Sequence, residues 1–453
     1  MTTIAEKKVI RKNVRDMIIP ITIENILQML VGFVSMALIG RIHPLAIAAL
    51  GLGNRVNGML WSLFKGIGIG AQIVVAQAFG AKNMKIIAKT IQQTLLGVVS
   101  IGIVLQLVLY NFGNSILKVL FDPKMELLSE ASMALRVLSF CVPFMAIVLV
   151  IGSVLQGLGD SRTPMFIAIA MNLINLGVSY CIIFGNFGFP KLGLKGAALG
   201  VVIAQASAAI IGLNILFGKR GKIRGFEIRD FFIPDWKIIT KVFKLGLPTS
   251  MESLFWQLST VVLTRALLVY GEVTYAAYQL GLQAESISFM PAAGFSVAAT
   301  AFIGQKLGAE EQETAKAYLK TILKGSAIIS IICAAPLVLA PDKIMRILTP
   351  DAELIAIGAS YVLIMGFVQL PQNIGGVLSG SLRGAGYTEM PMISSGIGLW
   401  GVRVPMSLLI AFVWKKEVTF IFLVIGVDML VRFIFNFIVF KKINIFKNYK
   451  MVK

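Results

Sequence analysis

The sequence predicts an all-α integral membrane protein of twelve transmembrane helices, arranged as two related lobes of six helices each. Two observations carry this prediction. The 453 residues are 57% hydrophobic and only 14% charged, whereas a soluble protein of this size carries about 25% charged residues. In addition, residues 20–83 align with residues 248–311 without a gap, so the chain consists of two related halves.

The repeat contains residues that hydrophobicity alone would not align. In the gapless alignment of 20–83 with 248–311, the repeat mates include Pro20 with Pro248, Glu24 with Glu252, Gly66 with Gly294 and Gln77 with Gln305. A second block also repeats, with QGLGDSRTPM (156–165) over RGAGYTEMPM (383–392). Two related halves in one membrane chain are the layout of many secondary transporters, whose substrate path lies between the halves.

A helix needs roughly 20 apolar residues to cross a bilayer. Apolar runs of that length predict twelve spans, at 17–41, 46–80, 86–112, 130–155, 163–188, 195–217, 241–270, 274–306, 316–340, 353–381, 390–414 and 417–440. Six spans per half is an even number, so both halves enter the membrane from the same side and the repeat is parallel. Prolines within spans can bend a helix, and these are Pro20, Pro143, Pro248, Pro371 and Pro405. We expect Pro20 and Pro248 to be the bends shared by the two lobes.

Basic residues predict the orientation of the chain. One set of connections contains both termini and the segment 218–244, and it carries about three times the positive charge of the opposite set. We therefore expect a multi-pass protein of a prokaryotic cytoplasmic membrane, with both termini in the cytoplasm. The basic linker 218–240 divides an N-lobe, residues 1–217, from a C-lobe, residues 241–453.

Composition and motifs exclude several classes of function. The net charge of +20 comes from Lys and Arg in loops and at the chain ends, which is typical of membrane orientation and not of nucleic-acid binding. The single histidine, His43, and three cysteines without CxxC spacing argue against a metal site or a disulfide. No GxxxxGK[ST], HExxH or GxSxG motif occurs, so we predict neither an ATPase domain nor an enzyme. The expected partners are small-molecule substrates and the lipid bilayer, with no nucleic acid, no metal and no cofactor except transported Na⁺ or H⁺, and we expect a monomer.

Charges within spans are candidate functional residues, because burying a charge in lipid costs several kcal/mol. Glu24 and Glu252 each follow a proline by four residues and can bind a proton or Na⁺. Alternatively, both are glutamates near the cytoplasmic start of a span that reach water. Trp256 and Gln257 follow Glu252 at helical spacing, which favours Glu252 as part of a cavity.

Glu285 lies deep in its span among polar neighbours that include Gln283. A carboxylate surrounded by amides and hydroxyls suits a hydrated cavity. The alternative is a hydrogen bond between helices or a salt bridge to Arg265 or Arg403.

Asn172, Asn175 and Ser179 recur at helical spacing in the fifth span. They can present amide oxygens and a hydroxyl to a cation or a substrate, or they can hold two helices together. Asp428 and Arg432, at a spacing of four, predict a structural ion pair on one helix face. Lys65 either repels cations from a cavity or pairs with Glu24.

Several stretches resemble the multidrug and toxin extrusion (MATE) family of cation-coupled exporters. They are GFVSMALIGRIHPLAIAALGL (32–52), GIGIGAQIVVAQAFGAKN (66–83), LQGLGDSRTPM (155–165), GLKGAALGVVIAQ (193–205), MPAAGFSVAATAFIGQKLGA (290–309), RGAGYTEMPM (383–392) and GLWGVRVPMSLL (398–409). The resemblance covers nearly the whole chain and implies a V-shaped pair of six-helix bundles. It also implies export of amphipathic organic cations in exchange for Na⁺ or H⁺.

The sequence departs from the family where the family binds cations. Ser35 and Ser179 stand where many members carry aspartate, and Val201 replaces a common threonine, so only Asn175 of that N-lobe site carries over. In the C-lobe, Trp256 occupies the usual acidic position, and the acid here is Glu252, one turn earlier. The resemblance therefore implies coupling through Glu252, Glu285 and Glu24 instead.

The combined prediction is an H⁺- or Na⁺-coupled antiporter that exports amphipathic organic cations and drugs by alternating access between two lobes. Its cavity and coupling residues would be drawn from Glu252, Glu285, Glu24, Asn175, Asn172, Gln283, Trp256 and Arg403. The alternative function is a lipid-linked saccharide flippase, whose anionic cargo suits Lys65, Arg55, Arg265 and Arg403.

Overall fold

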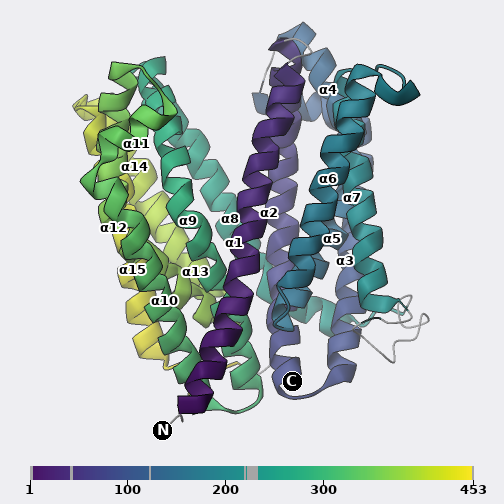
Figure 1. The fold of residues 1–453 in the computed structure, drawn as a ribbon, viewed down its shortest axis with the longest axis vertical. Helices are drawn as coiled ribbons and strands as arrows, with labels where there is room; N and C mark the ends of the chain where they lie inside the picture. The colour runs from purple at the N-terminus through teal and green to yellow at the C-terminus, as the bar shows by residue number, and fades with distance from the viewer. Residues whose placement is uncertain (1–3, 41–43, 122–123, 219–220, 222–232, 451–453) are drawn as a thin grey trace. The chain divides into compact units, whose positions relative to one another are not determined.

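A computed structural model describes residues 4–40, 44–121, 124–218, 221 and 233–450. The described residues form helices joined by short connections, and no strand occurs among them. Most of the predicted linker 218–240, and His43, lie outside this range. The helices are α1 (Ile4–Gly40), α2 (Pro44–Gly80), α3 (Met84–Phe121), α4 (Met125–Ser139), α5 (Val142–Gly157), α6 (Arg162–Phe184), η1 (Asn186–Gly188), α7 (Leu194–Phe217), α8 (Trp236–Leu268), α9 (Glu272–Gly308), α10 (Gln312–Leu339), α11 (Pro341–Leu348), α12 (Ala352–Gly384), α13 (Glu389–Ser395), η3 (Gly396–Arg403), α14 (Val404–Leu408), η4 (Leu409–Trp414) and α15 (Val418–Ile443) (Figure 1).

The helices account for the predicted membrane spans. Among the described residues, eight helical segments are long and apolar enough to cross a bilayer, and two bent pairs raise the number to ten. The two further long helices are α1 and α8, which are the least apolar of the long helices and begin the two repeats. With them the described chain contains the twelve predicted segments, and the prediction of an all-α membrane fold is confirmed.

Three of the predicted spans are not single straight α-helices, and one of them is α9, which is bent by 51° between Ser286 and Ser288. The span predicted at 130–155 consists of α4 and α5, which are bent by 52°. Pro143 stands in the first turn of α5, where its missing N–H cannot continue the hydrogen bonding of α4. The span predicted at 390–414 contains two π-helical stretches, η3 and η4. Pro20 and Pro248 lie inside α1 and α8 as expected.

The chain forms two compact units, and each is described by itself. The C-unit comprises Met1–Thr22, Ala76–Lys82 and Met251–Lys453, and the N-unit comprises Ile23–Val75 and Asn83–Ser250. The unit boundaries within α1 and α8 fall after Thr22 and after Ser250, which are repeat mates. Each unit thus holds the first part of the helix that begins the other repeat. The lobe boundaries at 217 and 241 stay a prediction.

The C-unit is built around α12. Helices α9, α10 and α15 surround it (Figure 1), and the first part of α1 adds Val14 and Met17 to the apolar core. In the N-unit, α3 packs on α5 and α6 packs on α7. The first part of α8 packs there against α2, where Ser250 donates a hydrogen bond to the Leu63 carbonyl at 2.8 Å.

Glycines show that the two halves repeat their packing as well as their sequence. A Cβ on Gly157 would lie 2.8 Å from the Gln72 carbonyl, and a Cβ on Gly384 would lie 2.6 Å from the Thr300 carbonyl. Gln72 and Thr300 are repeat mates, and the two glycines occupy matching positions of the second repeat block. The same helix contact therefore forms in both halves, and it needs glycine because no side chain fits between the backbones.

Candidate functional site

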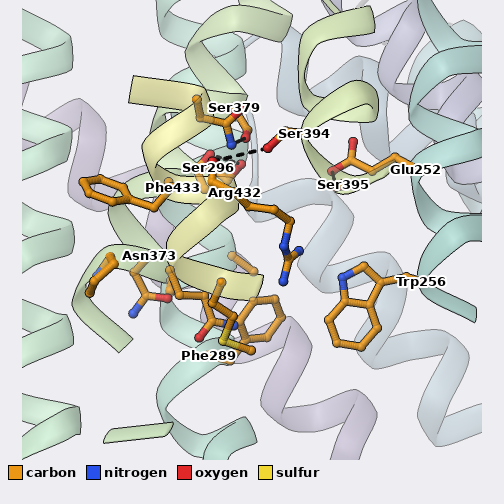
Figure 2. Close-up of a pocket in the computed structure, with 18 of the residues that line it drawn as sticks. Glu252, Trp256, Phe289, Ser296, Asn373, Ser379, Ser394, Ser395, Arg432 and Phe433 are labelled. Atoms are coloured by element: carbon orange, nitrogen blue, oxygen red, sulfur yellow. Dashed lines mark hydrogen bonds between the residues drawn. The ribbon is translucent and has the colours of Figure 1, made fainter. Parts of the chain in front are cut away.

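A cavity of the C-unit is about 330 Å³ in volume and lies between α8, α9, α12, α13 and α15. Its walls combine aromatic rings with amides, hydroxyls and charges. Figure 2 shows Glu252 and Ser395 beside each other, with Trp256 on the same side of the cavity and Asn373 and Phe433 opposite. A few convergent polar groups in a largely apolar cavity are typical of small-molecule sites.

Glu252 forms an ion pair inside this cavity. Its Oε2 lies 2.6 Å from Nη2 of Arg383 on α12, and Ser395 donates a hydrogen bond to its Oε1 at 3.3 Å. The side chains of Glu252 and Arg383 are only 19% and 14% exposed. Because both charges are largely removed from water, each depends on the other for compensation.

A second ionic group, centred on Asp428 of α15, lies next to the cavity. Asp428 is fully buried and binds Arg403 at 2.7 Å and Arg432 at 3.0 Å. The expected pair of Asp428 and Arg432 is therefore present, and Arg403 joins it. A Cβ on Gly398 would clash with Oδ1 of Asp428, so the π-helical stretch η3 approaches the carboxylate at a residue without a side chain.

Arg403 and Trp256 connect the ionic group to the cavity wall. The Arg403 guanidinium lies 5.2 Å from the centroid of the Trp256 ring, within the range of a cation–π contact. Arg403 itself is 2% exposed and is not part of the cavity lining. It contacts Trp256, which does line the cavity.

Glu285 on α9 is buried away from the cavity lining. Its Oε2 accepts a hydrogen bond of 2.5 Å from the Tyr361 hydroxyl, and the Tyr361 ring packs against Tyr278 and Phe422. The interhelical hydrogen bond is one of the two alternatives that the sequence left open for Glu285. Gln283 is exposed and does not line the C-unit cavity.

The N-unit contains a smaller cavity of about 90 Å³. Glu24 and Lys65 both line it, so the structure brings the two residues of the expected pair to one cavity. Gln28 donates to Oε1 of Glu24 at 3.4 Å. Gln156 and Gln205 complete the polar part of the lining.

The predicted asparagines do not line the N-unit cavity. Asn175 accepts a hydrogen bond from Ser179 at 3.1 Å within α6, and Asn172 is buried. Next to them, a Cβ on Gly200 would clash with the Ser179 hydroxyl. Ser179, the partner of Asn175, thus lies where α6 packs on α7.

The structure separates the predicted site residues into groups. It brings Glu252 and Trp256 into one cavity with Arg403 directly behind, and Glu24 into another, while Glu285 and the two asparagines lie outside both linings. Sequence analysis missed Arg383. The signal was present in the second repeat block, where Arg383 aligns with Gln156.

Comparison with known proteins identifies the family. The MatE family model matches residues 20–181 and again residues 248–409. The two matches begin at the repeat mates Pro20 and Pro248, and together they cover more than half of the chain. This chain belongs to the MatE family. It is accordingly a multi-pass membrane transporter and not an enzyme.

Relatives of this MatE protein carry names connected with drug resistance. It is 30% identical over 408 residues to a probable multidrug resistance protein NorM of Thermotoga maritima, covering 90% of this chain and 86% of the relative. It is 28% identical to a probable multidrug resistance protein YoeA of Bacillus subtilis, covering 88% and 87% of the two chains.

Solved structures share the fold of this MatE protein at low sequence identity. A MOP superfamily transporter from Pyrococcus furiosus aligns with a TM-score of 0.88 at 19% identity, over 99% of this chain and 100% of the other. An outward-facing multidrug resistance MATE family transporter aligns with a TM-score of 0.86 at 19% identity, over 99% of both chains.

Proposed function

We propose that this protein is an H⁺- or Na⁺-coupled antiporter that exports amphipathic organic cations and drugs by alternating access between its lobes. The names of its relatives support multidrug export. The proposal rests mainly on Glu252, a largely buried carboxylate beside Trp256, Phe289 and Phe433 in the C-unit cavity. Aromatic faces and a carboxylate together suit a flat organic cation.

Competition at Glu252 would supply the coupling. In the described structure Arg383 neutralises Glu252 at 2.6 Å. A proton, Na⁺ or a substrate cation that binds the Glu252 carboxylate releases Arg383. Only one of these three can bind to Glu252 at a time. Binding of the ion from outside then favours release of the drug, which is the requirement for antiport. We place the protein in the cytoplasmic membrane with both termini in the cytoplasm.

The test is efflux of a cationic dye from proteoliposomes under an imposed Na⁺ gradient and, separately, under an imposed pH gradient. We expect one gradient to drive transport in the wild type and Glu252→Gln to abolish it. Glu272→Gln is the matched control, because Glu272 is exposed at the start of α9. Gradient-driven efflux that persists in Glu252→Gln would refute coupling through this residue.

A second candidate function is flipping of a lipid-linked saccharide. Arg383 and Arg432, which both line the C-unit cavity, favour it because they suit an anionic diphosphate. Absence of dye movement under either gradient, with transfer of a lipid-linked saccharide in the same vesicles, would establish this function.

A further inference from the structure

A groove of about 640 Å³ lies between α3 and α4 of the N-unit, apart from the two cavities described above. The polar residues that α4 contributes to its lining are Ser129, Ser132 and Arg136. They are spaced by three and four residues, so they lie on one face of the helix. Phe140 follows on the same face, and its ring lies edge-on to that of Tyr110 on α3, with 5.7 Å between the centroids.

The groove lies near the membrane surface. α3 has 38 residues, so at about 1.5 Å per residue it is roughly 57 Å long, whereas the hydrocarbon core of a bilayer is about 30 Å thick. The predicted apolar span on α3 ends at residue 112, and two lining residues, Tyr110 and Asn114, stand on either side of that end. Tyrosine is enriched at this depth, where lipid headgroups meet acyl chains.

The groups of the groove follow the order of a lipid molecule. Its walls are consecutive helices that pack together and are joined by a short connection, so they run in opposite directions. Asn114 and Ser129 lie closer to this connection, whereas Tyr110 and Phe140 lie further from it and are 46% and 45% exposed. A lipid with its headgroup near the connection therefore has its acyl chain at the aromatic rings.

Arg136 gives the groove a positive charge. It is the one charged side chain among the described residues of the lining, which includes neither acid of α4, Glu126 or Glu130. Its guanidinium has no ion pair or hydrogen bond within the part of the chain that the structure describes. Arg136 also lies inside the predicted span 130–155, where a charge is costly without a compensating partner. A guanidinium binds phosphate through two parallel hydrogen bonds.

The repeat shows that the fold itself does not require this arginine. At the spacings of the two repeat blocks, 228 and 227 residues, the positions equivalent to Arg136 are Ile364 and Leu363. Both residues are apolar. The charge is therefore a feature of the N-unit that the C-unit does not share.

We propose that the groove binds one phospholipid with an anionic headgroup, whose phosphate pairs with Arg136 and whose acyl chain packs on Tyr110 and Phe140. The Ser129 hydroxyl and the Asn114 amide can donate hydrogen bonds to the headgroup. An anionic headgroup fits better than a zwitterionic one, because the described lining offers no carboxylate to an ammonium group. This inference concerns contact with the bilayer and holds whichever substrate the protein exports.

The test is native mass spectrometry of the purified protein in detergent with added phosphatidylglycerol or phosphatidylcholine. We expect the wild type to retain one phosphatidylglycerol in preference to phosphatidylcholine. Arg136→Gln should weaken this binding about tenfold, because it removes a charge-assisted pair with phosphate. Arg346→Gln is the matched control and should bind like the wild type. Arg346 is an exposed arginine on α11, which follows α10 as α4 follows α3.

Three results would overturn the proposal. They are equal retention of the two lipids by the wild type, equal losses in Arg136→Gln and Arg346→Gln, and displacement of the lipid by an equal concentration of inorganic phosphate, which would indicate a site for a free anion. Ser132→Phe fills the groove and keeps the arginine, so it should lose the lipid as well. This variant decides if Arg136→Gln fails to fold, and full retention of phosphatidylglycerol in Ser132→Phe would place the lipid elsewhere.

Discussion

The two cavities occupy equivalent places in the repeat but hold their charges differently. Glu24 and Glu252 are repeat mates and each lines the cavity of its unit. In the N-unit the accompanying cation is Lys65 of the second helix, whereas in the C-unit it is Arg383 of α12. Arg383 aligns with Gln156. The positive charge that accompanies the glutamate therefore lies on a different helix in the two units, whereas the glutamate keeps the same position in the repeat.

This exchange changes what each cavity can accept. Ala293, the repeat mate of Lys65, lines the C-unit cavity and leaves room there. The C-unit cavity is about 330 Å³ and the N-unit cavity about 90 Å³. The duplicated fold thus has a small cavity in one half and a larger cavity, with more room for a substrate, in the other.

The largest expected effect concerns the ionic group that the C-unit adds behind its cavity. Asp428→Ala leaves Arg403 and Arg432 without their carboxylate, and the side chain of Arg403 is 2% exposed. Breaking a buried ion pair from one side costs about 3–5 kcal/mol. We expect a loss of that size in the free energy of unfolding, measured by thermal or denaturant unfolding in detergent.

Asp342→Ala is the control for this variant, because Asp342 is an exposed acid in the first turn of α11. It should change stability by less than about 0.5 kcal/mol. Equal stability losses in the two variants would show that Asp428 does not compensate the arginines.

The second effect tests whether the cation can be moved between helices. Lys65→Ala should destabilise the protein by about 1–3 kcal/mol, because the Glu24 carboxylate loses the positive charge that lines the same cavity. Adding Gln156→Arg reproduces in the N-unit the arrangement of Glu252 and Arg383, and we expect it to restore most of the loss. The measurement is a double-mutant cycle on the free energy of unfolding. If the stability losses of Lys65→Ala and Gln156→Arg simply add in the double mutant, the two cavities are not equivalent.

The third effect distinguishes two repeat-related glycines. A Cβ on Gly66 would clash with the backbone of Ser250, with the Ser250 Cα only 2.7 Å away, whereas a Cβ on Gly294 would have its nearest contact at 3.3 Å, with Ile18. Gly66→Ala should therefore destabilise by about 2 kcal/mol through overpacking. Gly294→Ala should stay within about 1 kcal/mol of the wild type, because helix propensity offsets the tight contact. The measurement is the Tm of Gly66→Ala and of Gly294→Ala, each compared with the wild type. Similar shifts in Tm would contradict the difference in packing between the two glycines.

Much of the fold could be predicted from the sequence, because the signals are physical and local. Span length and the aligned prolines, glutamates and glutamines revealed the helices and the repeat. Pro143 was among the prolines expected to bend a span, but the size of the bend between α4 and α5 could not be predicted, since hydrophobicity alone does not give its angle. The assignment of the first part of α1 to the C-unit depends on contacts far apart in the chain.

The candidate site was less predictable, for a reason that Arg383 illustrates. Long side chains on different helices meet only when helix rotation is known, and near-uniform hydrophobicity hides the apolar face that would reveal it. Arg403 was singled out as a buried charge, but its contacts with Asp428 and Trp256 were not foreseeable. Local ion pairs such as Asp428 with Arg432 were predictable because the helix fixes their spacing.

The smallest effect compares the helix caps of the two units. Asp235 accepts hydrogen bonds from the backbone N–H groups of Lys237 and Ile238 at the start of α8, and its Oδ2 lies 2.5 Å from the Lys89 ammonium. In the C-unit, Asp351 caps α12 through Glu353 and Leu354, with no ion pair among the described residues. Asparagine caps a helix about as well as aspartate, so Asp235→Asn should lose only the ion pair, and Asp351→Asn should be neutral.

The hydrogen bond from Lys89 lowers the pKa of Asp235 below its ordinary value. A carboxyl group with a lowered pKa in the folded state stabilises the protein above its unfolded-state pKa, near 4, and this contribution is lost as the pH falls through the folded-state pKa. We expect Asp235→Asn to cost at most about 1 kcal/mol at pH 7, because the pair is near water. The difference from the wild type should shrink below about pH 4 and in 1 M NaCl. A difference in Tm that is constant from pH 7 to pH 3.5 would show that the Asp235 side chain acts only as a cap, and that the two units fix these helix starts in the same way.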